Sequence, residues 1–101
     1  MNDYDKKWRK ALIEVMDAQG GRLFSDAQLG VTVLIVPCAG EHSKFADVAV
    51  AQCDFKDDEF KRKRGELIAL ERWANNESLS VGFDYRTFEE IYVATVKLLV
   101  G

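Results

Sequence analysis

The feature that most constrains the fold is the run Val31-Thr32-Val33-Leu34-Ile35-Val36, which lies between Gly30 and Pro37. β-Branched side chains favour an extended backbone, and proline ends such a run because it has no amide hydrogen to donate. The run has almost no polar positions, so both of its faces are expected to be covered. The chain is therefore predicted to fold around a small sheet in which this strand is central.

A second extended segment, residues 45–53, follows a short polar loop. Two strands with such a link predict an antiparallel hairpin. A turn placed near the middle of the polar loop puts Cys38 opposite Asp47 and Cys53 opposite Thr32. On this register the two sulfurs lie beyond disulfide reach, and we expect two thiols in a reducing compartment.

The first twenty residues have the pattern of an amphipathic helix. Asp3 or Asp5 is the expected N-cap, and the Gly20-Gly21 pair is expected to end the helix. Apolar residues that recur at three- and four-residue spacing predict one apolar stripe. The stripe consists of Tyr4, Trp8, Ala11, Leu12, Val15 and Met16. Both tryptophans of the chain, Trp8 and Trp73, are expected in the core.

The residues that follow the hairpin, 54–76, predict a second helix. Asp57 or Asp58 is its expected N-cap, since acidic residues are favourable at a helix N-terminus. Arg64 falls on the apolar side of this helix, where its stem is expected to pack on the sheet. Residues 22–29, before the central strand, are compatible with either a strand or a turn.

The C-terminal quarter begins with an alternating segment, residues 79–83, that predicts a short edge strand. The pattern Thr87-x-x-Glu90 is a capping box, so Thr87 is expected to start a third helix. Residues 91–96 are rich in strand formers, which leaves a strand open for residues 87–100. The predicted fold is a single α+β domain over residues 1–101. An N-terminal helix precedes a central antiparallel hairpin in a small sheet, and two C-terminal helices pack on that sheet.

Charge and targeting patterns narrow the function classes. The formal net charge is −3, which argues against a general binder of nucleic acids or membrane surfaces. No apolar segment follows the charged N-terminus, so no signal peptide is expected. The longest apolar run is too short to span a bilayer. We expect a cytoplasmic protein with no membrane partner.

Residues suited to catalysis are few. Cys38, His42 and Cys53 could together supply three metal ligands or a Cys–His pair, but none of the paired ligand motifs of zinc sites accompanies them. The acidic run 57–59 is better explained by helix-terminus stabilisation than by acid–base chemistry. We therefore expect no enzyme, no catalytic residue, no cofactor and no metal.

The most conspicuous charged run is Lys61-Arg62-Lys63-Arg64. Four consecutive helical residues point in about four directions, because each is rotated by about 100° from the last. They cannot all face one groove, which weakens a nucleic-acid interface. A small nucleic-acid-binding regulator that uses residues 61–64 remains the alternative function.

The segment from Val48 to Arg72 carries a resemblance. A strand, an acidic turn and then the pattern F-x-R-K-x-G-x-x-x-A-x-x-R resembles small uncharacterised proteins encoded by phages and prophages. The resemblance covers about a quarter of the chain and implies a phage accessory protein, for example of the anti-CRISPR or another anti-defence type. It rests on six residues, none of which it implies to be catalytic: Phe60, Arg62, Lys63, Gly65, Ala69 and Arg72.

The predicted function is a non-enzymatic, phage-type inhibitor or adaptor in the host cytoplasm. It would bind and block a host protein or protein complex, such as a CRISPR effector or another defence enzyme. Exposed basic and aromatic side chains are the expected contacts, since such residues dominate protein interfaces. These are Arg62, Lys63, Tyr85 and Arg86. A homodimer is compatible with this function and with the alternative.

Overall fold

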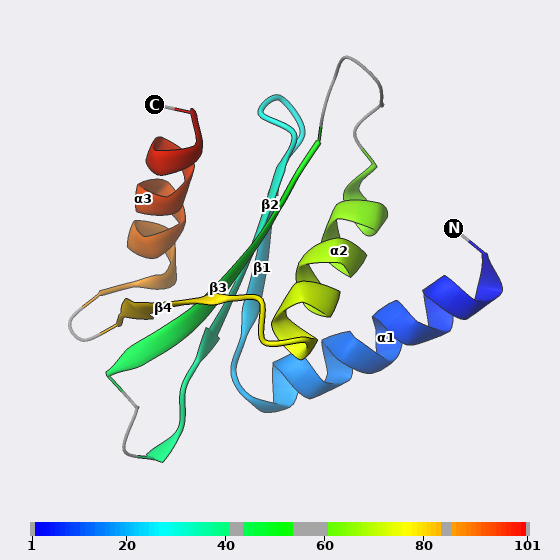
Figure 1. The fold of residues 1–101 in the computed structure, drawn as a ribbon, viewed down its shortest axis with the longest axis horizontal. Helices are drawn as coiled ribbons and strands as arrows, with labels where there is room; N and C mark the ends of the chain where they lie inside the picture. The colour runs from blue at the N-terminus through cyan, green and yellow to red at the C-terminus, as the bar shows by residue number, and fades with distance from the viewer. Residues whose placement is uncertain (1, 41–43, 54–60, 84–85, 101) are drawn as a thin grey trace.

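The computed structural model describes residues 2–40, 44–53, 61–83 and 86–100 (Figure 1). These residues form three helices and four strands, which confirms the α+β class. Their order is α1 (Asp3–Ala18), β1 (Arg22–Asp26), β2 (Val31–Pro37), β3 (Phe45–Gln52), α2 (Arg62–Ala74), β4 (Leu79–Gly82) and α3 (Phe88–Val100).

The four strands form one antiparallel sheet in the order β1-β2-β3-β4. The β2–β3 hairpin is central, as predicted, and β4 is an edge strand. Every residue of β2 from Val31 to Val36 is buried, because helices cover both faces of the sheet. The ambiguous segment before β2 pairs with it as the strand β1.

The register of the hairpin differs from the predicted one by two residues. Asp47 pairs with Val36 instead of Cys38, and Thr32 pairs with Ala51 instead of Cys53. The Cys38 amide continues this register, because it donates to the carbonyl of Phe45 at 3.0 Å. A shift of two residues leaves every side chain on its predicted face, because side chains alternate with a period of two.

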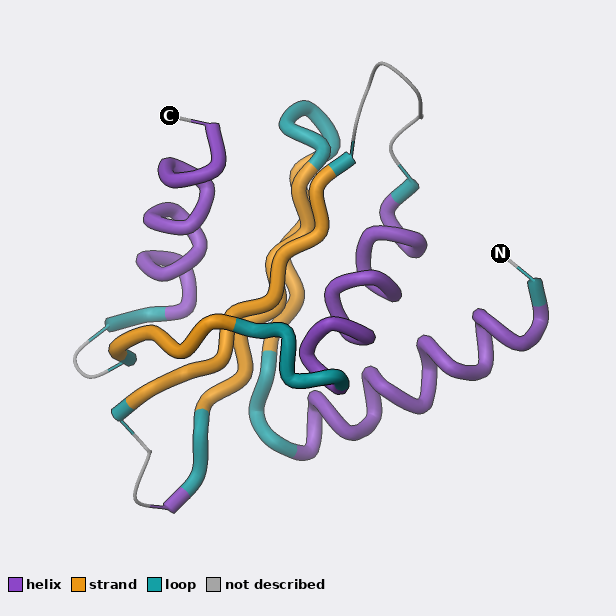
Figure 2. Tube along the Cα trace, viewed as in Figure 1, coloured by secondary structure: helices purple, strands orange, loops and turns teal. Residues whose placement is uncertain are grey.

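The helices lie in two layers with the sheet between them, α1 and α2 on one side and α3 on the other (Figures 1 and 2). The buried cluster on the α1–α2 side consists of Leu12, Met16, Leu34, Val36, Ala49, Ala51, Leu67, Ala69 and Leu70. The cluster on the α3 side consists of Val31, Val33, Ile35, Ala46, Val48 and Ile91. Trp73 packs partly buried against the first cluster, as expected.

Helix α1 differs from its prediction in two respects. Its N-cap is Asn2 rather than Asp3 or Asp5, and the Asn2 side chain accepts from the Asp5 amide at 2.8 Å. The apolar stripe is also divided. Leu12 and Met16 are buried, whereas Trp8 remains 40% exposed, so the prediction that Trp8 lies in the core is wrong.

Helix α2 begins later than predicted. Its N-cap is Lys61, with an extended backbone and no side-chain capping bond, whereas Asp57 and Asp58 lie outside the described residues. Arg64 is exposed rather than packed on the sheet. Because α2 starts at Arg62, Arg64 lies in its first turn. The buried face of α2 begins after that turn and is formed by Glu66, Leu67, Ala69 and Leu70.

The C-terminal segment is a helix, and the strand that its composition left open does not form. The Glu90 amide donates to the Thr87 hydroxyl at 3.1 Å, which is the N-cap interaction that the sequence predicts. The ring of Tyr92 stacks on Phe24 of β1, with ring centroids 4.9 Å apart. The helix-starting signal therefore prevails over local strand propensity, because α3 also buries Ile91 on the sheet.

Candidate partner-binding surface

The structure separates the side chains that the sequence proposes as contacts. Arg62 and Lys63 lie exposed at the start of α2, on one side of the sheet. Arg86 is exposed two residues before α3, the helix that covers the other side of the sheet (Figure 1). Tyr85 lies outside the described residues. The three described contacts therefore adjoin two helices, α2 and α3, that lie on opposite sides of the sheet.

A basic hollow of about 180 Å³ lies between the two helices of the first layer. We call it the basic hollow, and its lining residues are Lys6, Lys61, Lys63 and Arg64. One cation comes from α1 and three come from the N-terminal end of α2. Among the described residues, no carboxylate lines it, so four positive charges face one opening.

An ion pair joins α1 to α2, the two helices that form the basic hollow. Arg9 of α1 donates to Glu66 of α2, with Nη2 and Oε1 2.8 Å apart. The carboxylate side chain is only 8% exposed and the guanidinium side chain 22% exposed. Such a short ion pair, largely shielded from water, sets the spacing of α1 and α2. It lies about one helical turn from the basic hollow.

The electrostatics of the basic hollow favour anionic groups. Lysine and arginine are positively charged at neutral pH. The hollow also lies at the N-terminus of α2, where free amides and the helix dipole add partial positive charge. The first turn of α2 contains no acidic residue that would offset this charge. An anionic side chain or a phosphate of a macromolecular partner fits this arrangement.

Sequence reasoning identified the α2 part of this surface but missed Lys6. The basic run was recognised from its composition, whereas Lys6 lies far from it in the sequence and reaches the hollow only through the packing of α1 on α2. No local pattern could have revealed that contact.

Two residues of the pattern F-x-R-K-x-G-x-x-x-A-x-x-R have structural roles. Ala69 is fully buried against the sheet, where a larger side chain would separate α2 from it. The Arg72 guanidinium donates to the carbonyl of Val50 in β3. Arg62 and Lys63 are exposed cations that can meet a partner, and Phe60 lies outside the described residues.

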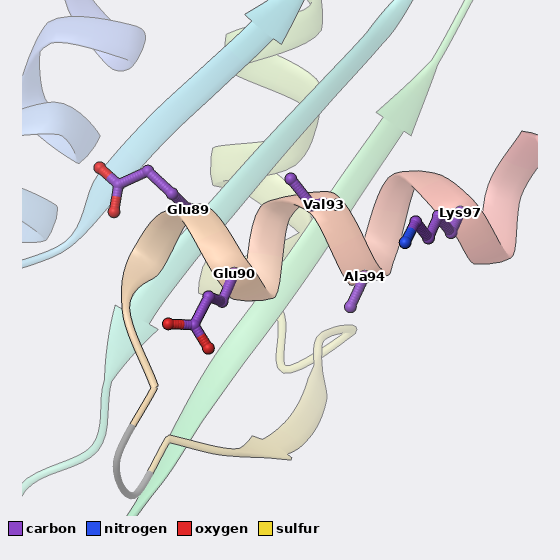
Figure 3. Close-up of a pocket in the computed structure, with 5 residues that line it drawn as sticks. All are labelled: Glu89, Glu90, Val93, Ala94 and Lys97. Carbon is purple, nitrogen blue, oxygen red and sulfur yellow. The ribbon is translucent and has the colours of Figure 1, made fainter.

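A second, shallower hollow of about 370 Å³ lies along α3 (Figure 3). Its lining residues are Glu89, Glu90, Val93, Ala94 and Lys97. Figure 3 shows the two carboxylates at the start of the helix and the lysine near its end, so both signs of charge are present. Glu89 is also engaged by Arg22 at 3.4 Å. This surface has no single charge preference that would select a ligand class.

The cysteines are poorly placed for shared chemistry. Cys38 follows β2 and Cys53 follows β3, so they lie at opposite ends of the hairpin, roughly 27 Å apart at about 3.4 Å per residue. Burial, and then the negative charge of Asp47, raise the pKa of the Cys38 thiol, which leaves less of it as the reactive thiolate at neutral pH. His42 lies outside the described residues. Within the described ranges, no group of three metal-ligating side chains comes together.

Two further findings bear on partners. No helix in the described part of the chain has the length and apolar character needed to cross a bilayer. No family model, curated protein or solved structure matches the chain in sequence or fold.

Proposed function

We propose that this protein is a non-catalytic inhibitor or adaptor of the phage type, which docks on an acidic surface of a host protein complex through the basic hollow. The observation that carries the proposal is the convergence of four cations from two helices on one opening: Lys6, Lys61, Lys63 and Arg64. Host defence complexes such as CRISPR effectors are the proposed targets, and the phage-like segment that contains Lys63 supports that choice.

The chemistry of this docking is a set of charge-assisted hydrogen bonds. Each cation would donate to a carboxylate of the partner, and the arginine can do so with two parallel bonds. The Arg9–Glu66 pair limits how far α1 and α2 can separate, so the helices that carry the cations keep their spacing before binding. Less conformational entropy is then lost on association than if the two helices moved independently.

A nucleic-acid-binding regulator is the second candidate, favoured by the same lack of lining carboxylates among the described residues. The net charge of −3 opposes this function, because the protein as a whole would repel a nucleic acid, which is negatively charged along its full length. A protein with a local acidic patch and a mixed surface elsewhere avoids this repulsion. We therefore place a host protein first.

The test is affinity capture from host lysate, with and without nuclease treatment, followed by mass spectrometry. The double variant Lys63→Glu/Arg64→Glu reverses two charges of the basic hollow. The matched control, Lys44→Glu/Lys97→Glu, makes the same change in net charge at exposed positions elsewhere. We expect one protein complex to be captured by the parent chain and the control after nuclease treatment, and to be lost with the hollow variant.

Other results would reject the protein partner. Capture that disappears with nuclease, together with a steep fall of DNA affinity as salt rises, would establish the nucleic-acid regulator. A protein complex captured equally by the hollow variant would show that binding occurs through another surface.

A further inference from the structure

Helix α1 has a second apolar face that the fold does not use. We call it the outer stripe, and it consists of Tyr4, Trp8, Ala11 and Val15. Tyr4 is 73%, Trp8 40% and Val15 49% exposed. Spacings of four, three and four residues place these side chains within a narrow arc of the helix. The spacing is that of the seam along which two helices pack together.

The fold uses a neighbouring line of the same helix. Leu12 and Met16 are buried, Ile13 packs partly buried beside them, and Arg9 contacts Glu66. The N-terminal end of α1 also lies away from the sheet at the edge of the molecule (Figure 1). The outer stripe is therefore accessible along its full length.

The charges of α1 differ between its two halves. Residues 3–10 contain four cations and two acids, whereas residues 11–18 contain two acids and no cation. Lys7 and Glu14 flank the stripe on the same side, two turns apart. At about 1.5 Å rise per residue they are roughly 10 Å apart, too far to pair within one helix. Neither forms an ion pair with any residue that the structure describes.

We propose that the occupant of the outer stripe is a second copy of this chain, bound as an antiparallel α1–α1 pair. An antiparallel arrangement places Lys7 of each copy beside Glu14 of the other, twice per dimer. The cationic half of one helix then lies against the acidic half of its mate, whereas a parallel pair would place like charges together. The same register sets the large Trp8 against the small Ala11 and Tyr4 against Val15, so large and small side chains interlock.

This inference goes beyond the proposed function and does not depend on it. Lys6, the α1 residue of the basic hollow, lies about 160° around the helix from Trp8, at about 100° per residue. The dimer would therefore present two basic hollows that both remain accessible. Two linked copies would bind a repetitive or two-fold partner more tightly than one copy, through avidity.

The first test is the oligomeric state of the purified full chain, by sedimentation across a concentration series. We expect a concentration-dependent dimer that Trp8→Glu abolishes. The matched control, Leu98→Glu, introduces the same charge on α3, where Leu98 is 87% exposed, and leaves the dimer intact. Circular dichroism of each variant establishes that it has folded.

The second test uses the charges, at exposed positions where folding is not at stake. Lys7→Glu alone and Glu14→Lys alone should each weaken dimerisation by about tenfold, because both contacts then join like charges. The double swap Lys7→Glu/Glu14→Lys should restore it. Mixing the two single variants should yield a heterodimer, because each supplies the charge that the other lacks.

Three results would overturn the proposal. A wild-type chain that stays monomeric at every concentration would assign the outer stripe to a different protein or, if Trp8 fluorescence shifts on anionic lipid vesicles, to a membrane surface. A dimer that survives Trp8→Glu would show that another face is used. A dimer that the double swap fails to restore would exclude the antiparallel arrangement.

Discussion

Arg9 and Glu66 form the one ion pair that joins two helices across the described part of the molecule, with Nη2 and Oε1 2.8 Å apart. Glu66 is buried although it is a carboxylate, and Arg9 keeps its Nε buried without a partner. A charge withdrawn from water is tolerated only where an opposite charge and hydrogen bonds replace the lost hydration. The pair therefore fixes how α1 sits on α2.

Glu66→Ala should lower the free energy of unfolding by about 2 kcal/mol, since it leaves a half-buried guanidinium without its acceptor. The exposed pair Arg22–Glu89 supplies the control, with side chains 59% and 65% exposed. Glu89→Ala should cost less than about 0.5 kcal/mol, as is usual for surface pairs. Urea denaturation measures both, and equal losses would contradict the structural role of the Arg9–Glu66 pair.

Substitutions at Gly21 and Gly82 give a second prediction with its own control. A Cβ on Gly21 would lie 2.5 Å from Cγ of Met16 and 3.1 Å from Cγ2 of Val36, both in the buried core. Gly21→Ala should therefore destabilise the protein by about 2 kcal/mol through overpacking. A Cβ on Gly82 meets nothing within 4 Å, so Gly82→Ala should leave the melting temperature within a few degrees. A tolerated Gly21→Ala would show that α1 and β2 can separate at no cost.

The elements that the sequence predicts correctly are those with local signals. β2 is fixed by its β-branched run between Gly30 and Pro37, and α3 by the Thr87 capping pattern. The register of the hairpin was missed because the polar loop does not define where pairing stops. The start of α2 at Arg62 was not predicted, because acidic residues that precede a helical pattern are usual N-caps and Lys61 is not.

The candidate site depended more on tertiary structure. Composition alone marks the basic run at residues 61–64, but its meeting with Lys6 follows from how α1 packs on α2. The sequence also does not show that the apolar stripe of α1 is divided into a buried and an exposed part, because the same apolar spacing fits either arrangement. Trp8 and Leu12 look equivalent in sequence, and only the position of α2 decides that Leu12 is buried and Trp8 is not.

Thr87→Ala should destabilise the protein by about 1 kcal/mol, the usual cost of losing an N-cap. The threonine hydroxyl accepts from the Glu90 amide at 3.1 Å, and alanine cannot replace that acceptor. Thr87→Ser keeps the oxygen and should retain most of the stability. Thermal denaturation of the three proteins checks this, and a serine variant as unstable as the alanine variant would exclude capping as the cause.

The last prediction concerns the Cys38 thiol, whose pKa is raised by burial and then by the charge of Asp47. A raised pKa means less thiolate at a given pH, so iodoacetamide should modify Cys38 more slowly than an unfolded peptide at pH 8. The folded state holds the proton more tightly than the unfolded state. The resulting stabilisation is complete below the ordinary thiol pKa and is lost as pH rises through the raised value.

Asp47→Asn should speed the modification of Cys38 by iodoacetamide, measured at the Cys38 peptide by mass spectrometry. Asp17→Asn, a change at an exposed position on α1, should not alter the rate. An unchanged rate in Asp47→Asn would leave burial as the sole cause of the raised pKa.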